Sequence, residues 1–417
     1  MHPMRNNFLL ALALQFVVMP AALIGQPCAQ ADLKPAAQRV KTIQAQLIAF
    51  KVRDEMDEDV PAPLQSLIHT FKDALAELAD AELHCASGNP TPKEIESPLA
   101  KLLSANKPVQ QEVYDPKKPP QLDQIYGEDL HVKVTGDPPQ LVLVEFDFGV
   151  ACGYDAILLG YEMRSSTWQR VLRWQSPDYA EVLGAFGDFF RYVILPATAS
   201  DGWRAVVAHG HPWCTSSWSA FDLDVVQPSS AGSAQTVLQH VNRGYIRGDI
   251  EPALKIVPEG FQIRLQTAML DPEISRRIGI YRYRVSGAAI ERVQPIANNG
   301  RDFVDEWLES PWDESARWSV PENLEALKAT HAKIETERSS TADNSLLRNY
   351  GPVLACSDAR AHFQVELDAA WIDSKGMSTP DTSTYFQLHE GKKSFTLLST
   401  SDQPDRRCMG PDIMAKK

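Results

Sequence analysis

The sequence predicts an α+β protein that is mainly β, with an N-terminal helical segment, a central antiparallel β region and a small C-terminal β unit. Before residue 105, apolar residues recur at three- and four-residue steps, the spacing of amphipathic helices. Between about 121 and 297, short β-branched and aromatic runs follow one another every eight to twelve residues, separated by turn residues. A proline-rich stretch at 106–120 lies between the two patterns, and we interpret it as a linker.

Residues 1–31 have the three-part pattern of a cleavable secretory signal. Arg5 stands in a polar start, the run Phe8–Gly25 is almost wholly apolar, and Ala29 and Ala31 are the small residues that precede a cleavage point. We expect cleavage near Ala31 and a periplasmic or extracellular location. Of the 417 residues, 386 would remain. Nothing later reaches the roughly 18 apolar residues of a membrane-spanning helix, so we expect a soluble mature chain without a transmembrane segment.

The charge balance disfavours two classes of partner. The whole chain has a formal net charge of −13, and the mature chain would have −14, because Arg5 is the only charged residue in the signal. An acidic surface repels nucleic acid and anionic lipid, so neither is an expected partner. The simpler effect of this acidity is solubility.

Residues 32–105 are predicted to form a small helical bundle. Val40, Ile43, Leu47 and Phe50 share one helical face, and a stronger stripe runs from Leu64 to Leu78. A third helix is predicted to begin at Thr91. Pro92 suits the first turn, and Glu94, three residues after the cap, completes a capping-box pattern.

The region 121–297 divides into three units of four short strands each, at about 130–175, 181–242 and 253–295. Each unit has a strong second strand, and these are Leu141–Phe148, Trp203–Ala208 and Phe261–Met269. Repeated four-stranded units are typical of β-propeller blades. Three blades are too few to close a propeller, however, and an open meander or a β-sandwich gives the same pattern.

The C-terminal third is predicted to be a helical connection, 298–345, followed by a small β unit, 346–417. Phe303, Val304, Trp307 and Leu308 share a helical face. The run Ser319–Glu322 is a second capping-box pattern, predicted to open a helix that reaches about Ile334. In the β unit, His389–Lys393 is predicted to be a hairpin turn.

Five cysteines follow the signal, and export makes disulfides the first expectation for them. Cys152 and Cys214 each follow the second strand of neighbouring units, so we expect their loops to lie on one edge and the two residues to pair. Cys356 and Cys408 bracket the C-terminal β unit and are predicted to staple it. Cys85 is left over, as a thiol near a helix end. There is no C-x-x-C pattern.

The densest polar cluster is the run His209–Cys214. His209 and His211 point to the same side of an extended strand and could bind zinc or copper with a third ligand. We favour a loop that holds a disulfide, because a disulfide-bonded Cys214 cannot be a thiolate ligand, and we therefore predict no metal and no cofactor. The tentative binding residues around this edge, which would contact a protein or glycan partner, are Tyr154, Trp203, His209, His211, Trp213 and Trp218. Core packing is the alternative for the tryptophans.

Two further sets of charged residues are weaker candidates. Paired carboxylates could serve glycoside hydrolysis, and the candidates are Asp188, Asp201, Asp222 and Asp224. An anion or partner site could form in the third unit from Arg264, Arg276, Arg277, Arg282 and Arg284, although a solvated strand face explains them more simply.

The motifs of several large enzyme classes are absent. The sequence contains no G-x-S-x-G, H-E-x-x-H, G-x-x-x-x-G-K-[ST] or G-x-G-x-x-G pattern, and it names no catalytic residue. It favours an exported binding or structural protein of the cell envelope or extracellular space. The alternative is an exported hydrolase of glycan or peptide, with or without the assistance of a metal.

Overall fold

The computed structural model describes most of the chain from residue 30 onward. The described ranges are 30–50, 60–86, 88–104, 125–137, 140–151, 153–176, 189–197, 202–210, 218–229, 232–246, 250–271, 276–287, 289–293, 297–339, 345–357, 361–372, 382–392 and 394–414.

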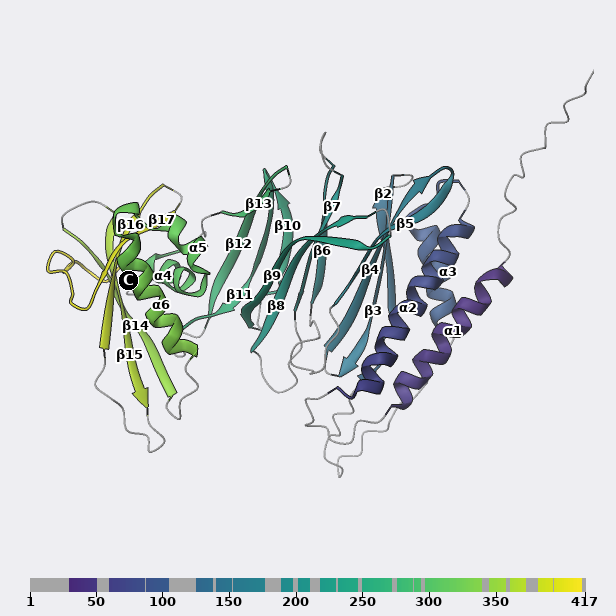
Figure 1. Ribbon diagram of the computed structural model, residues 1–417, viewed down its shortest axis with the longest axis horizontal. Coiled ribbons are helices and arrows are strands. Elements are labelled where there is room, and N and C mark those ends of the chain that lie inside the picture. The colour runs from purple at the N-terminus through teal and green to yellow at the C-terminus, as the bar shows by residue number, and fades with distance from the viewer. Residues whose placement is uncertain are drawn as a thin grey trace, which may run out of the picture.

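Three N-terminal helices cover one face of the first sheet (Figure 1). They are α1 (Gln30–Ala49), α2 (Ala62–Cys85) and α3 (Pro92–Ser104). The capping box predicted at Thr91 is confirmed. The Thr91 backbone N–H donates to Glu94 Oε2 at 2.7 Å, and the Glu94 N–H donates back to Thr91 Oγ1 at 3.4 Å. These bonds from the Thr91 backbone and hydroxyl hold the pKa of the Glu94 carboxyl below its usual value.

The first sheet is an antiparallel meander with one added short strand. Its strands are β1 (Ile125–Tyr126), β2 (His131–Asp137), β3 (Leu141–Ala151), β4 (Gly153–Arg164) and β5 (Thr167–Gln175). β1 and β2 both pair with β3, and β4 and β5 follow in order. Alternation along β3 sends Val144 and Phe146 toward the helices and Leu143 toward the second sheet. Both faces of this sheet are therefore covered.

The second and third sheets repeat the four-stranded meander. The second contains β6 (Phe190–Leu195), β7 (Arg204–Gly210), β8 (Trp218–Pro228) and β9 (Ala234–Ile246). The third contains β10 (Ala253–Val257), β11 (Gly260–Ala268), β12 (Arg276–Ser286) and β13 (Ala289–Arg292). Ala205 and Val207 pack against the first sheet, whereas Val206 and Ala208 pack against the third.

The predicted α+β, mainly β class is thus confirmed, with repeated four-stranded antiparallel units. Figure 1 shows how the units are arranged: the three sheets stand in a row that starts beside the helices, at the right, and runs toward the left. Each interface in the row is an apolar layer between two sheet faces.

A fourth four-stranded sheet and three helices form the C-terminal unit. The helices are α4 (Gly300–Glu309), α5 (Trp312–Ser315) and α6 (Leu324–Ser339), with 3-10 turns at Ala316–Trp318 and Pro321–Asn323. The strands are β14 (Ser345–Ala355), β15 (His362–Ile372), β16 (Thr382–Glu390) and β17 (Phe395–Ser401). Phe303 and Trp307 of α4 share a core with Val365 and Phe386 of the sheet.

The capping box predicted at Ser319 is wrong. The Ser319 hydroxyl donates to the Ser315 carbonyl at 2.8 Å and accepts from the Trp307 indole at 3.0 Å, and the turn that follows has Val320 at its N-cap with no side-chain cap bond. A 3-10 turn follows, and α6 begins only at Leu324 and runs to Ser339. Tertiary hydrogen bonds to a buried tryptophan override the local pattern here.

A buried ionic network joins the third sheet to α4. Arg277 Nε donates to Asp305 Oδ2 at 2.8 Å, and Arg277 Nη2 donates to Glu306 Oε2 at 2.5 Å. Arg292 donates to the other oxygen of Glu306. Arg277 therefore belongs to this interface and does not form a surface anion site with Arg276, Arg282 and Arg284. Arg284 pairs instead with Glu259.

Both edges of the fourth sheet carry additional backbone partners. Along β14, the Gly410 N–H donates to the Ala355 carbonyl at 3.0 Å and the Ile413 N–H to the Val353 carbonyl at 3.0 Å. At β17, the Val320 N–H donates to the Leu397 carbonyl at 2.9 Å.

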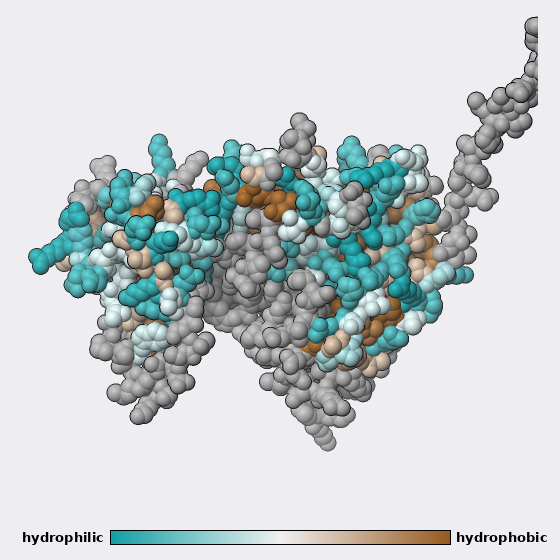
Figure 2. Space-filling view, in the orientation of Figure 1, coloured by the Kyte–Doolittle hydropathy of each residue, from teal (hydrophilic) through white to brown (hydrophobic). Residues whose placement is uncertain are grey.

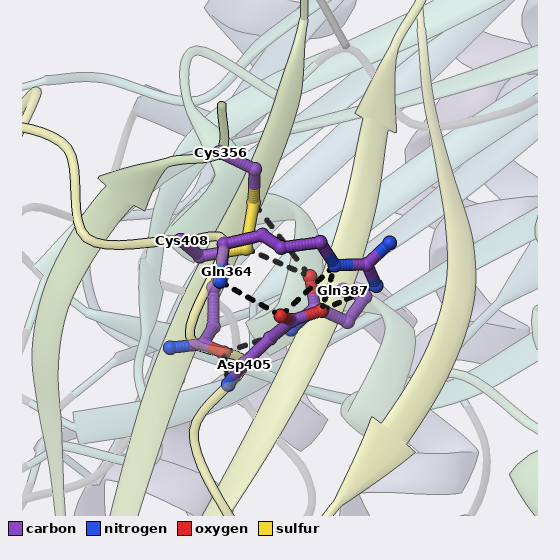
Figure 3. The surroundings of a disulfide bond; sticks show 6 residues. Cys356, Gln364, Gln387, Asp405 and Cys408 are labelled. Carbon is purple, nitrogen blue, oxygen red and sulfur yellow. Dashed lines mark hydrogen bonds and ion pairs between the residues drawn. A yellow bond between two sulfur atoms is a disulfide. The ribbon is translucent and has the colours of Figure 1, made fainter. Parts of the chain in front are cut away.

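The predicted Cys356–Cys408 disulfide is confirmed, and Figure 3 shows its surroundings. It ties the C-terminal segment to the end of β14, beside Gln364 and Gln387 of the outer sheet face. The Asp405 N–H donates to Gln364 Oε1 at 2.7 Å. The prediction of a thiol at Cys85 is wrong, because Cys85 is disulfide-bonded. The predicted Cys152–Cys214 pair lies outside the described residues.

None of the helices in the described ranges is long and apolar enough to cross a membrane. Figure 2 shows hydrophilic side chains over most of the described surface on one face of the molecule, with apolar side chains confined to small areas.

Candidate functional site

A cavity of about 220 Å³ lies between the first and second sheets, beside the middle of β3 and the end of β7. The first sheet contributes His131, Glu145, Asp147, Tyr154, Asp155, Ala156, Trp174 and Ser176, and the second contributes Phe189, Phe190, Arg191 and His209.

Two carboxylates of β3 form one wall. Glu145 and Asp147 are two residues apart, so both face the second sheet, as Leu143 does. Their partners on β2 stand directly opposite in register, Lys133 across from Glu145 and His131 across from Asp147. Lys133 Nζ lies 3.3 Å from Glu145 Oε2, and His131 Nδ1 lies 3.1 Å from Asp147 Oδ1. Burial raises the pKa of the Glu145 carboxyl, although nearby Lys133 opposes that rise.

Aromatic rings and a second histidine–aspartate pair form the opposite wall. His209 stands across from Asp222 in the β7–β8 register, with Nε2 3.5 Å from Asp222 Oδ2, and both side chains are buried. Trp174 lies between the sheets, with ring centroids 5.1 Å from His209 and 5.3 Å from Phe190.

The tryptophan is held by a carboxylate behind it. Trp174 Nε1 donates to Asp224 Oδ2 at 2.9 Å. Burial raises the pKa of Asp224, while the Trp174 hydrogen bond opposes that rise. The indole is thereby fixed with its ring, and not its N–H, available to the cavity.

Behind the cavity lies a buried ionic cluster that includes a helix residue. Lys72 of α2 reaches through to the sheet, and its Nζ lies 2.7 Å from Asp155 Oδ2 and 2.9 Å from Ser176 Oγ. The Ser176 hydroxyl in turn donates to Asp155 Oδ1 at 2.5 Å. Asp155 and Ser176 line the cavity, so the helical segment positions part of its wall.

The structure brings some of the sequence-predicted residues to this cavity and not others. Tyr154 and His209 both line it. Trp203 lies at the start of β7, away from His209, where its indole N–H donates to Glu162 Oε1 at 2.8 Å. Trp168 is buried in the core beneath the helices. His211, Trp213, Asp188, Asp201, Cys152 and Cys214, and the side chain of Trp218, lie outside the described residues.

Of the predicted carboxylates, Asp222 and Asp224 share the face of β8 that looks toward the first sheet. The sequence patterns did not indicate His131, Glu145, Asp147, Trp174 and Phe190. One signal could have found part of this set. Glu145 and Asp147 interrupt the apolar run of a strand that is buried on both faces. Charged residues seldom occupy such positions without a partner or a function.

Among the described residues, no group of three histidine, cysteine, aspartate or glutamate side chains is placed to hold a metal ion. The cavity instead combines aromatic surface with hydrogen-bonding groups, which is the usual make-up of a small-molecule site.

Comparisons with known proteins assign no family. No family model matches the chain, and no curated protein matches it. Among solved structures, one described as a complex of BT0996 with RGII aligns at 9% identity and a TM-score of 0.24. The alignment covers 68% of this chain and 88% of the chain in that structure. A second, described as a glycoside hydrolase, aligns at 7% identity and a TM-score of 0.23, covering 69% and 90%. These scores are too low for either likeness to support an argument.

Proposed function

We propose that this is an exported binding protein of the cell envelope or extracellular space, and that its cavity between the first two sheets takes part of a glycan. The lining of that cavity carries the proposal. Trp174, Phe190 and Tyr154 offer aromatic surface for the apolar face of a sugar ring, while Glu145, Asp147 and Ser176 offer hydrogen-bonding atoms for hydroxyl groups.

The size of the cavity limits what enters. About 220 Å³ is below the roughly 300–1,000 Å³ of sites for drug-sized ligands. A single sugar unit suits it better than a long chain. Tyr154, with 47% of its surface exposed, stands at the mouth, where a neighbouring unit would pass.

Export is part of the same proposal. The three-part signal pattern of residues 1–31 supports it, and so do the disulfide bonds of Cys85 and of Cys356 with Cys408, because disulfides persist in oxidising compartments. Sequencing the N-terminus of the secreted or periplasmic protein tests this, and recovery of the intact chain in the cytoplasm alone contradicts it.

Binding is tested with the mature protein on an array of oligosaccharides, followed by titration calorimetry of the positives. Tyr154→Ala should weaken binding about tenfold, since an exposed ring that stacks on a ligand contributes roughly 1 kcal/mol or more. Ile256→Ala is the matched control, because Ile256 is equally exposed, at 49%, on the third sheet. Absence of binding to every glycan overturns the proposal.

A hydrolase is the second candidate, and one observation favours it. Glu145 is a buried carboxyl with a raised pKa, and it stands beside a second carboxylate, Asp147, in the same cavity. Two neighbouring carboxyl groups, one of them with its pKa raised by burial, are the arrangement that glycoside hydrolysis uses. Incubating a bound oligosaccharide with wild type and with Glu145→Gln decides between the two. Products formed by wild type alone indicate a hydrolase, and an intact ligand indicates a binding protein.

A further inference from the structure

We infer that the cavity selects saccharides that donate hydrogen bonds, neutral or amine-bearing, over saccharides that carry a carboxylate. This rests on the proposed function and names the ligand class for the same site. The reason is that internal partners take the donors of Ser176 and Trp174, while Glu145 and Asp147 add carboxylate oxygens to the same lining.

Ser176 shows this at the inner wall. A serine hydroxyl has one hydrogen and two lone pairs. The hydrogen goes to Asp155 Oδ1 at 2.5 Å, and one lone pair accepts from Lys72 Nζ at 2.9 Å. The ammonium of Lys72 cannot accept, so it fixes this direction. What Ser176 has left for a ligand is a lone pair.

Trp174 follows the same rule. Its only donor, the indole N–H, is bound to Asp224 Oδ2 at 2.9 Å. An anionic group at the indole would meet the electron-rich ring face alone, which favours C–H groups and cations.

His131 also uses a donor internally. Its Nδ1 lies 3.1 Å from Asp147 Oδ1, and a carboxylate oxygen accepts, so the N–H at Nδ1 is directed to Asp147 and not to a ligand. Glu145 and Asp147 themselves add carboxylate oxygens to the same wall.

Arg191 is the one permanent cation among the described lining residues, and its position limits its effect. Its Nη1 donates to the Phe190 carbonyl at 2.8 Å, its Nη2 lies 3.7 Å from Glu251, and its side chain is 45% exposed. An exposed and paired guanidinium is screened by solvent. A ligand carboxylate would therefore lose its hydration and face Glu145 and Asp147, with only this screened guanidinium as a permanent cation among the described lining residues.

The test uses pairs of oligosaccharides with the same linkage that differ only at C6, where one carries a carboxylate and the other a hydroxymethyl group. Oligogalacturonate with its carboxyl-reduced galactan is one pair, and oligoglucuronate with the matching glucan is another. A chitosan trimer and cellotriose compare an amine with a hydroxyl at C2. Calorimetry on the full mature protein should show the neutral member binding about tenfold or more tighter than the carboxylate member.

Two variants assign the selectivity to the wall. Asp147→Asn and Glu145→Gln each replace an acceptor oxygen by a donor N–H₂ group, and either should reduce the preference for the neutral member several-fold. Glu259→Gln, the same change on the exposed turn of the third sheet, should leave it unchanged. If no saccharide binds, the proposed function itself fails. If saccharides bind but the carboxylate members bind equally or better, only this inference fails. It also fails if neither variant alters the preference.

Discussion

Lys72 of α2 and Asp155 of β4 form an ion pair 2.7 Å long in which neither side chain is exposed by more than 1%. The pair crosses from the helical layer into the first sheet and ends at the cavity wall. One contact therefore links the packing of the N-terminal helices to the geometry of the proposed site.

Replacing Lys72 by methionine should destabilise the protein by about 3–5 kcal/mol, because a buried carboxylate is left without its cation. Urea unfolding at pH 7 measures the loss. Arg39→Met is the matched control, since its pair with Glu77 joins α1 to α2 at the surface, with both side chains about half exposed, and such pairs contribute about 0–1 kcal/mol. Equal stability of the two variants would show that Asp155 finds another partner.

Arg277→Met should cost about 3–5 kcal/mol for the same reason, since Asp305 and Glu306 of α4 would lose a buried guanidinium. We expect hydrogen exchange to increase first in α4, which depends on this network for its contact with the third sheet. Arg284 lies on the same strand, but its side chain is 53% exposed and pairs with Glu259. Arg284→Met should therefore change stability by less than about 1 kcal/mol. Unchanged exchange in α4 would contradict the expectation.

The double substitution Cys356→Ser and Cys408→Ser should destabilise the C-terminal unit by up to about 4 kcal/mol, because the bond closes a loop of 52 residues. A separate early transition in thermal unfolding, with protease cleavage between residues 402 and 414, is the expected result. The wild-type protein under reducing conditions provides the comparison. A single transition at the wild-type temperature would show that the tail is held by its other hydrogen bonds.

Glycan binding should weaken as the pH falls, because protonation of Glu145 replaces one of its accepting lone pairs by an O–H donor and removes its charge. Burial raises the pKa of this carboxyl, so the proton returns at a higher pH than for an ordinary glutamate, and affinity is lost as pH falls through that raised value. Calorimetry between pH 7 and pH 4 follows the loss. In Glu145→Gln, this part of the pH dependence should be absent. An identical pH profile for the variant would assign the effect to another group.

Local patterns in the sequence predicted much of the fold. The second strand beginning at Leu141 is a nearly continuous apolar run because both of its faces are buried, and the one beginning at Phe261 alternates because one of its faces lies in an apolar core. The Thr91 cap was predictable because its hydrogen bonds stay within four residues. The Ser319 cap failed because its hydroxyl is used by Trp307, a partner twelve residues away.

The site was less predictable because its residues also meet through contacts between parts of the chain that are distant in sequence. His209 and Tyr154 were found from local clusters, but Glu145 and Phe190 meet only because two sheets stack face to face. Trp203 stands just before β7, at the opposite end of that strand from His209, and its indole N–H donates to Glu162. The sequence of a single strand does not specify which end of a neighbouring strand it will contact.

The tail hydrogen bonds along β14 and the Val320 bond to β17 have one more consequence. A free strand edge is a template on which a second chain can add by the same ladder of N–H and carbonyl groups. In the fourth sheet both outer ladders are already partly occupied by the protein's own backbone, at Val353 and Ala355 on one side and Leu397 on the other. These short contacts leave fewer free backbone groups at the sheet edges and therefore disfavour edge-to-edge polymerisation at this end of the molecule.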